Sequence, residues 1–141
     1  MVSEATGEAV AAMRKLLPQL SASAPPPDPA AVQRIVSSEA ITLLAARLDG
    51  QIVGLLALAM FPIPTGFRAW IEDVIVDEAA RGQGIGEALT KMALDLAEAA
   101  GARTVDLTSR PSREAAGRLY ERVGFAERST RIYRYTFGQG G

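Results

Sequence analysis

The sequence predicts one α/β domain with a central mixed, mostly antiparallel twisted sheet flanked by about four helices. Three observations point to this fold. The chain has 141 residues, a length that suits one domain rather than two. Segments with apolar residues at helical spacing alternate with short apolar runs typical of strands. An Asp-Gly pair joins two of those runs, a strong signal for an antiparallel hairpin. We therefore expect a single domain over residues 1–141 with a flexible tail at 138–141.

The N-terminal part of the chain is expected to form two helices. Residues 1–5 provide at most a short first strand. Apolar side chains then recur at helical spacing as far as Leu20, and Thr6 is placed to cap this first helix. A proline-rich stretch at 21–29 interrupts the pattern, because proline lacks the N–H that a helix or a central strand needs. We interpret this stretch as a connector, with a wall of a substrate site as the alternative. A second, short helix is expected over 30–37.

Three strands are expected to follow. The runs 41–48 and 51–60 flank Asp49-Gly50 and predict a hairpin. Residues 61–67 contain two prolines, so we expect the strand pattern to break there. A third strand is expected over 69–76.

The C-terminal part alternates helices with strands. Apolar spacing predicts a long helix from Ile85, closed by Gly101 as a C-cap. A strand over 105–108 is followed by a helix that Ser112 caps and Gly124 ends. Residues 132–137 alternate apolar and polar side chains, which predicts a final strand.

The composition excludes several kinds of chemistry. The chain has no cysteine, which rules out disulfides, thiolate nucleophiles and zinc–cysteine sites, and no histidine, which removes the commonest general base and metal ligand. We expect no metal. The net charge of −1 gives no electrostatic footprint for nucleic acid or a membrane surface. The longest apolar run, residues 52–61, is too short to span a bilayer, and the start does not resemble a signal peptide. A cytoplasmic location is the expectation.

A turn with three alternating glycines joins the third strand to the long helix. It reads Arg81-Gly82-Gln83-Gly84-Ile85-Gly86. Glycine lets backbone N–H groups approach a ligand, and a helix N-terminus adds unpaired donors and about half a positive charge. The run therefore predicts a pyrophosphate site, with a turn that binds nothing as the alternative. Glu87 occupies the last glycine position of a G-x-G-x-x-G fingerprint, and a P-loop sequence is absent, so both rival motifs are excluded.

Two motifs together resemble the GNAT superfamily of acetyl-coenzyme A-dependent N-acetyltransferases. The glycine run fits the family's Arg/Gln-x-x-Gly-x-Gly/Ala signature. Residues 106–125, which end in Ala-Ala-Gly-Arg-Leu-Tyr-Glu-Arg-Val-Gly-Phe, are similar to its second motif. The resemblance implies a GNAT-like fold and acetyl-coenzyme A as co-substrate. It also implies a strand bulge beside the cofactor, which the sequence itself does not show. The cofactor-binding residues that it implies are Arg81, Gly82, Gln83, Gly84, Ile85 and Gly86 for the pyrophosphate, and Val74, Ile75 and Val76 for the pantetheine arm.

Acetyl transfer to an amine needs the amine deprotonated and the departing thiolate protonated. An alkyl amine of pKa near 10.4 is neutral in only about one molecule in 2,500 at pH 7, a handicap of roughly 4.6 kcal/mol. Glu72 is the first candidate for handling this proton, through water or by binding the cation, and a strand-end acid without a catalytic role is the alternative. Asp73 is expected on the opposite face and ranks second. Tyr120 matches the family position that protonates the thiolate, with a core tyrosine as the alternative.

One position departs from the family pattern. Many members have asparagine before the Ala-Ala pair, where this chain has Glu114 preceded by Arg113. Arg113 is a candidate for a phosphate contact, and a solvated residue at the helix start is the alternative.

The acceptor is expected to be a primary amine of a small molecule or a peptide, which attacks directly in a ternary complex. Aromatic residues near an acidic pair suit a cationic amine. Five arginines could instead select an anionic acceptor, namely Arg68, Arg110, Arg128, Arg131 and Arg134. An acyl-coenzyme A-binding regulatory domain without catalysis is the alternative function. The resemblance also allows a homodimer, formed through the final strands.

Overall fold

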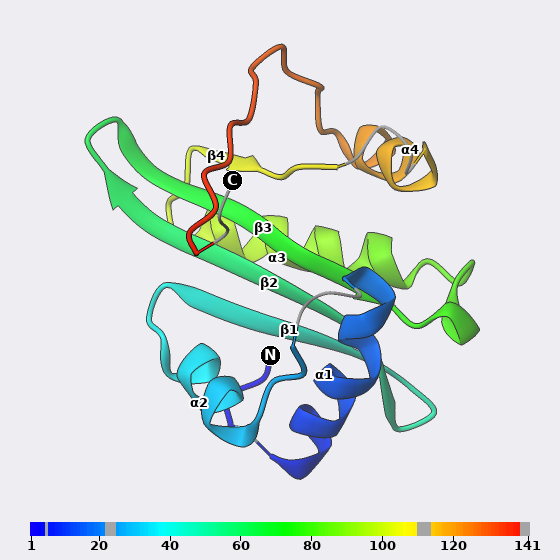
Figure 1. Ribbon diagram of the computed structural model, residues 1–141. Helices are drawn as coiled ribbons and strands as arrows, with labels where there is room; N and C mark the ends of the chain where they lie inside the picture. The colour runs from blue at the N-terminus through cyan, green and yellow to red at the C-terminus, as the bar shows by residue number, and fades with distance from the viewer. Residues whose placement is uncertain (5, 22–24, 110–113, 139–141) are drawn as a thin grey trace.

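The structure is a computed structural model that describes residues 1–4, 6–21, 25–109 and 114–138 (Figure 1). Its elements follow in the order α1 (Gly7–Leu20), α2 (Pro29–Ser37), β1 (Ile41–Leu48), β2 (Gln51–Ile63), β3 (Gly66–Val76), a 3-10 turn η1 (Glu78–Ala80), α3 (Ile85–Ala99), β4 (Thr104–Asp106) and α4 (Glu114–Val123). The predicted mixed sheet with four helices is confirmed. No helix in the described part of the chain is long and apolar enough to cross a membrane.

The sheet has the strand order β1-β2-β3-β4. The first three strands are antiparallel to their neighbours, whereas β4 runs parallel to β3. The β1–β2 hairpin turns at Asp49 and Gly50, whose φ angles of 53° and 82° are those of the turn that Asp-Gly favours. The hairpin predicted from this pair is therefore confirmed.

Helices cover both faces of the sheet and enclose two apolar clusters. The helix α3 packs on one face, where Leu56, Leu58 and Ile71 are buried beneath it. Helices α1 and α2 pack on the other face, over Leu55 and Ile75. Figure 1 shows α4 on the α3 side of the sheet, beyond β4. The region where β3 and β4 diverge thus lies on the same side as α4.

Predicted helix starts agree with the observed caps. The Thr6 side chain accepts a hydrogen bond from the Ala9 N–H at 3.1 Å, as an N-cap does. Asp28 caps α2 in the same way, accepting from the Ala31 N–H at 2.8 Å. The predicted cap Ser112 and the stretch 22–24 of the proline-rich connector lie outside the described residues.

The expected break at residues 61–67 is confirmed only at Pro64 and Thr65, because β2 continues through Pro62 to Ile63 and β3 already begins at Gly66. The Met60 N–H points toward β1, where it donates to the Ala40 carbonyl at 2.8 Å. Strand alternation turns the nitrogen of Pro62 to the same side, beyond the last residue of the β1–β2 register, Ile41 opposite Ala59. The missing N–H of Pro62 therefore removes no bond of the sheet.

The predicted final strand over 132–137 is also wrong, because residues 125–136 belong to no helix or strand and pair with no described strand. Alternation reports the tendency of a segment to lie in a sheet, but a strand also needs a partner edge. The nearest edge strand, β4, has only three residues and is shorter than the predicted 105–108. The expected first strand is reduced to one bridge between Val2 and Leu43.

Candidate active site

A β-bulge interrupts β3 in its second half. Leu55 lies opposite Ile75 and Ala57 lies opposite Glu72, so two residues of β3 face the single residue between them on β2. Asp73 has a φ of 50°, the left-handed conformation found at the first residue of one bulge type. This is the bulge that the family resemblance implied, and it lies between Glu72 and Val74.

The bulge reverses which face the β3 side chains occupy. Ile71 is buried in the cluster under α3, whereas Ile75, four residues later, is buried in the cluster under α1 and α2. Regular alternation would place both on one face, so the extra residue accounts for the change. Val74 and Val76 are consequently turned toward the α3 side, where Val74 packs against the first cluster.

Beyond the bulge, β3 has an edge without a described strand partner. The strand β4 pairs with β3 only from Arg68 to Trp70. Figure 1 shows β4 leading away to α4 while β3 continues to the turn before α3. The backbone from residue 74 to 76 thus presents N–H and C=O groups toward the space between the two strands. A bound chain that carries amides could pair with this edge as another strand would.

The glycine turn lies directly after this edge. Gly82 and Gly84 have φ angles of 84° and 77°, a conformation that glycine adopts without a steric cost. Apart from the adjoining residues of the turn, no described residue has an atom within 4 Å of a side-chain carbon built on either glycine, so space is open beside the turn. Gly84 is the N-cap of α3 and provides no side-chain capping hydrogen bond. The first N–H groups of α3 are therefore available to an anion.

Arg81 connects the turn to the end of β3. Its side-chain Nε donates to the Val76 carbonyl at 3.3 Å, although the residue as a whole is exposed. The structure thereby brings together three parts of the predicted cofactor site: the strand end, the arginine and the glycine turn.

Helix α1 fixes the start of the turn from the other side of the sheet. Asp77 is buried and forms an ion pair with Lys15 at 3.2 Å. Gln19 accepts from the Glu78 N–H at 3.0 Å, and Asp77 accepts from the Ala79 N–H at 3.2 Å. The Ala79 N–H and then the Lys15 ammonium hold the pKa of Asp77 below its usual value. The sequence analysis missed the contacts of Lys15 and Gln19, which join residues about 60 positions apart.

Helix α4 is held against the beginning of α3. A side-chain carbon on Gly86 would lie 3.4 Å from Leu119 Cδ1 and 3.7 Å from Val76 Cγ2, so glycine lets α4 approach closely here. Arg122 binds Glu87 at 3.0 Å, and this hydrogen bond lowers the pKa of Glu87. Both contacts place the helix that carries the second motif beside the glycine turn.

The two candidate catalytic residues occupy different environments. Tyr120 is half-buried on α4, and its ring meets that of Phe125 edge-on, with centroids 5.9 Å apart. Glu72 and Asp73 are both exposed at the bulge. The two carboxylates therefore lie on β3 and the phenol lies on α4. The two elements stand on either side of the space that opens where β4 no longer pairs with β3. Arg113 lies outside the described residues.

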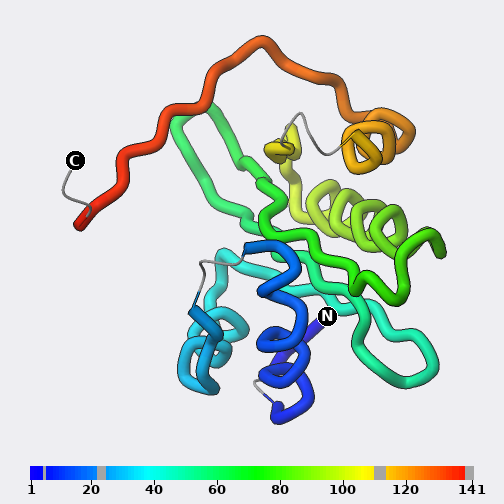
Figure 2. Tube along the Cα trace, turned by 45° about the vertical axis from the view of Figure 1, so that its right-hand side comes forward, coloured from blue at the N-terminus to red at the C-terminus, as the bar shows by residue number. Residues whose placement is uncertain are grey.

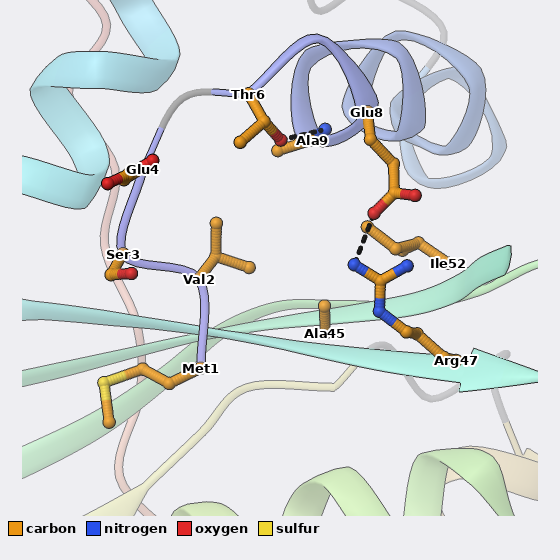
Figure 3. A pocket seen from close by; sticks show the side chains of 10 residues that line it. All are labelled: Met1, Val2, Ser3, Glu4, Thr6, Glu8, Ala9, Ala45, Arg47 and Ile52. Carbon is orange, nitrogen blue, oxygen red and sulfur yellow. Dashed lines mark hydrogen bonds and ion pairs between the residues drawn. The ribbon is translucent and has the colours of Figure 1, made fainter. Parts of the chain in front are cut away.

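A separate cavity of about 240 Å³ lies between the N-terminal segment, α1 and β1 (Figure 3). An ion pair between Glu8 and Arg47 closes one side, and the hydrogen bond from Arg47 lowers the pKa of Glu8. None of the predicted site residues lines this cavity, so it is distinct from the site at β3. Its lining is Met1, Val2, Ser3, Glu4, Thr6, Glu8, Ala9, Ala45, Arg47 and Ile52.

Comparison with known proteins identifies the family. Residues 10–125 match the model of the acetyltransferase (GNAT) family. The chain is 39% identical over 71 residues to N-alpha-acetyltransferase 30 of Schizosaccharomyces pombe, a match that covers 50% of this chain and 47% of that protein. The chain thus spans about half the length of this curated relative.

Solved structures share the fold over nearly the whole chain. A transcriptional regulator from Bacillus halodurans is 30% identical, with a TM-score of 0.83 over 95% of this chain and 97% of its own. An aminoglycoside N-acetyltransferase in complex with coenzyme A is 17% identical, with a TM-score of 0.77 over 91% of this chain and 88% of its own, and this likeness shows the fold alone. Given the family match, the bulged strand and the glycine turn, the chain belongs to the GNAT acetyltransferase family.

Proposed function

We propose that the protein transfers the acetyl group of acetyl-coenzyme A to a primary amine, which attacks the thioester directly in a ternary complex. The observation that carries the proposal is the continuity of three features. After the bulge, the edge of β3 that has no strand partner among the described residues leads into two left-handed glycines, and these lead into the N-terminus of α3, which lacks a side-chain cap. An amide-bearing arm that ends in a pyrophosphate matches this order of groups.

In this proposal the cofactor is held mainly by backbone. The first N–H groups of α3 and the Arg81 guanidinium bind the pyrophosphate, because both are donors at the positive end of the helix dipole. The Val74–Val76 segment pairs with the pantetheine arm. We also assign a phosphate contact to Arg113, which stands before Glu114 and the Ala-Ala pair and lies outside the described residues. No metal takes part in the proposed binding.

The reaction needs two proton transfers and an oxyanion donor. The amine nitrogen forms a bond to the acetyl carbon, the C–S bond breaks, and the sulfur leaves as a thiolate that takes a proton from the Tyr120 hydroxyl. The amine proton leaves through water held by Glu72, which is exposed to solvent at the bulge. A backbone N–H of the 74–76 segment donates to the oxygen of the tetrahedral intermediate.

A peptide N-terminus is the acceptor that we would test first. The curated relative that matches half of this chain at 39% identity is an N-alpha-acetyltransferase. The exposed carboxylates of Glu72 and Asp73 provide negative charge for an approaching ammonium group. Small-molecule amines remain in the acceptor panel.

The alternative is a regulatory domain that binds acyl-coenzyme A without catalysis. It is supported by the 30% identity to a protein described as a transcriptional regulator, which extends over nearly the whole chain. Such a domain would need the glycine turn but neither Glu72 nor Tyr120. The presence of both residues favours the enzyme.

The test is to follow thiol release from acetyl-coenzyme A with a disulfide reagent. The protein contains no cysteine, so coenzyme A is the only thiol in the assay. The panel contains N-terminal peptides, polyamines, aminoglycosides, amino acids and amino sugars. Acceptor-dependent release supports the enzyme and identifies the acceptor class. Tight acetyl-coenzyme A binding by calorimetry without release across the panel would favour the regulatory alternative.

A further inference from the structure

The segment between β3 and the glycine turn is held by side chains of α1, a helix far away in the sequence. Figure 2 shows α1 and α3 on opposite sides of the sheet. The second half of α1 nevertheless reaches the segment that leads into α3, where the side chains of Lys15 and Gln19 contact the first residues after β3. A helix on one face of the sheet thus holds the approach to the proposed cofactor site on the other.

The amide of Gln19 forms hydrogen bonds with both of its ends. Its Oε1 accepts from the Glu78 N–H at 3.0 Å, and its Nε2 donates to Asp77 Oδ1 at 3.5 Å. The first distance is typical of a hydrogen bond and the second is at its upper limit. The Lys15 ammonium lies 3.2 Å from the other oxygen of the Asp77 carboxylate. Because Lys15 and Gln19 are four positions apart, they lie on the same face of α1 and meet this segment together.

Asp77 is the residue on which these contacts converge. It is only 7% exposed, and a buried carboxylate is costly unless it is paired and hydrogen-bonded. Its carboxylate also accepts from the Ala79 N–H at 3.2 Å, and its own N–H donates to the Val53 carbonyl on β2 at 2.8 Å. Asp77 is therefore attached to the sheet and to α1 at the same time, which defines where the segment after β3 begins.

Glu78 connects Gln19 to Arg81. The N–H of Glu78 donates to Gln19, and its carbonyl accepts from the Arg81 N–H at 3.4 Å. The Arg81 side chain in turn donates to the Val76 carbonyl at 3.3 Å. Gln19 is thereby linked to the arginine that we assign to the pyrophosphate through the backbone of a single residue.

The residues after Arg81 need such support, because two of them are glycines. Gly82 and Gly84 adopt φ angles of 84° and 77°. Glycine loses more conformational freedom on folding than any other residue, so its sequence alone does not hold the turn in one conformation. A ligand that binds one conformation loses apparent affinity in proportion to the fraction of the protein that adopts it. Contacts that fix the start of the turn therefore raise the affinity for the ligand.

We propose that Gln19 is a positioning residue for acetyl-coenzyme A, which sets the position of the glycine turn through its hydrogen bonds to Asp77 and Glu78. Arg81 and the first N–H groups of α3 are then in place before the cofactor arrives. The inference rests on the proposed function, which assigns the pyrophosphate to this turn. Gln19 lies outside both family motifs, so the inference gives α1 a part in cofactor binding that the motifs do not imply.

Gln19→Met tests the proposal, because methionine has a similar length and helix propensity but forms neither hydrogen bond. The dissociation constant of acetyl-coenzyme A in calorimetry, and its KM, should rise about 10-fold. At saturating acetyl-coenzyme A, kcat should stay within about 2-fold, because Glu72 and Tyr120 are unchanged and the turn is fully occupied. Gln33→Met on α2 is the matched control, since it removes a hydrogen bond to Ser37 of the same helix. Its affinity for acetyl-coenzyme A should equal that of the parent.

Hydrogen exchange without cofactor gives a readout that does not depend on turnover. The amide of Glu78 should exchange at least about 10-fold faster in Gln19→Met than in the parent, because its acceptor has been removed and the segment opens more often. In Gln33→Met the exchange of this amide should be unchanged.

The outcomes separate this inference from the proposed function. If the parent binds acetyl-coenzyme A and Gln19→Met binds it equally well, the inference is overturned and the proposed function stands, even where the variant has a lower Tm. A lower kcat at saturation with unchanged affinity would also overturn it, because Gln19 would then act on the reaction and not on the turn. A parent that does not bind acetyl-coenzyme A would remove the proposed function and this inference together.

Discussion

Gly54 on β2 leaves room for the beginning of α3, the helix that follows the glycine turn. Replacing Gly54 with alanine tests whether this close approach matters. Gly54 lies opposite Val76 on the face that α3 covers. A side-chain carbon there would lie 3.1 Å from both Ile85 Cγ2 and Leu89 Cδ1, and 3.4 Å from the Ile75 carbonyl oxygen. Ile85 and Leu89 belong to the first two turns of α3. The added methyl group therefore pushes the beginning of α3 away from the sheet.

Two opposing contributions determine the sign of the change in the free energy of unfolding. Overpacking a core costs about 1–3 kcal/mol, whereas replacing glycine by alanine returns about 0.5–1 kcal/mol of chain entropy. We expect Gly54→Ala to lower the free energy of unfolding by about 1 kcal/mol, which corresponds to roughly 3–4 °C in Tm for a chain of this size. The displaced helix should also weaken acetyl-coenzyme A binding, since the N-terminus of α3 is the proposed pyrophosphate site.

The matched control is Gly117→Ala on α4. Outside the backbone of α4 itself, no described residue has an atom within 4 Å of a side-chain carbon built on Gly117, and the residue is inside a helix. This variant should gain about 0.5–1 kcal/mol, because alanine is the better helix former. Urea unfolding of both variants, with calorimetric titration of coenzyme A, measures the two effects. If Gly54→Ala proves as stabilising as the control, the close contact between β2 and α3 is not a constraint and the reasoning fails.

Five further variants probe the proposed site and its support. Gly84→Val should abolish coenzyme A binding in calorimetry, because the φ of 77° strains a β-branched residue and its methyl groups fill the open side of the turn; unchanged affinity would remove the pyrophosphate assignment. Tyr120→Phe should lower kcat by about 10²-fold or more with little change in cofactor affinity, and equal turnover would end its role as the acid. Glu72→Gln should lower kcat/KM by at least about 10-fold, whereas Asp73→Asn, which keeps a residue tolerant of positive φ, should not; equal losses would leave both as structural. Asp77→Asn should destabilise the protein at neutral pH. Because folding lowers the pKa of Asp77 below 3.8, the stabilising contribution of its carboxylate is present above that pH and is lost as the pH falls through the folded-state pKa. In urea unfolding, the difference in stability between the variant and the parent should shrink below about pH 4, and a difference constant with pH would contradict this account.

Local patterns predicted those parts of the fold that local interactions determine. The Asp49-Gly50 hairpin, the cap at Thr6 and the glycine turn each depend on the conformational preference of a few consecutive residues. The proposed pyrophosphate site could be recognised for the same reason, since alternating glycines and a following helix pattern are both visible in the sequence.

The remaining features depend on contacts between distant residues. Pro62 is tolerated in β2 because β1 has already ended beside it, which no local pattern reveals. The contacts of Lys15 and Gln19 with the turn after β3 join residues about 60 positions apart. The bulge at Asp73 is invisible to alternation, because Asp73 and its neighbours are compatible with a regular strand as well. The predicted strand at 132–137 failed in the described chain for want of a partner edge.

The bulge in β3 also bears on how this site can change during evolution. Its geometry depends on the number of residues between Ile71 and Ile75 and on a residue at position 73 that tolerates a positive φ, because one extra position is what moves the second half of the strand to the other core. Substitutions at the exposed Glu72 are therefore compatible with the bulge and with the backbone edge that we propose for the cofactor. Deletion of a single residue in this stretch would restore regular alternation. The side chains of Val74 and Val76 would then face α1 and α2 instead of α3, and the end of β3 would no longer lead correctly into the glycine turn. Related sequences should accordingly vary in composition here while keeping the same length.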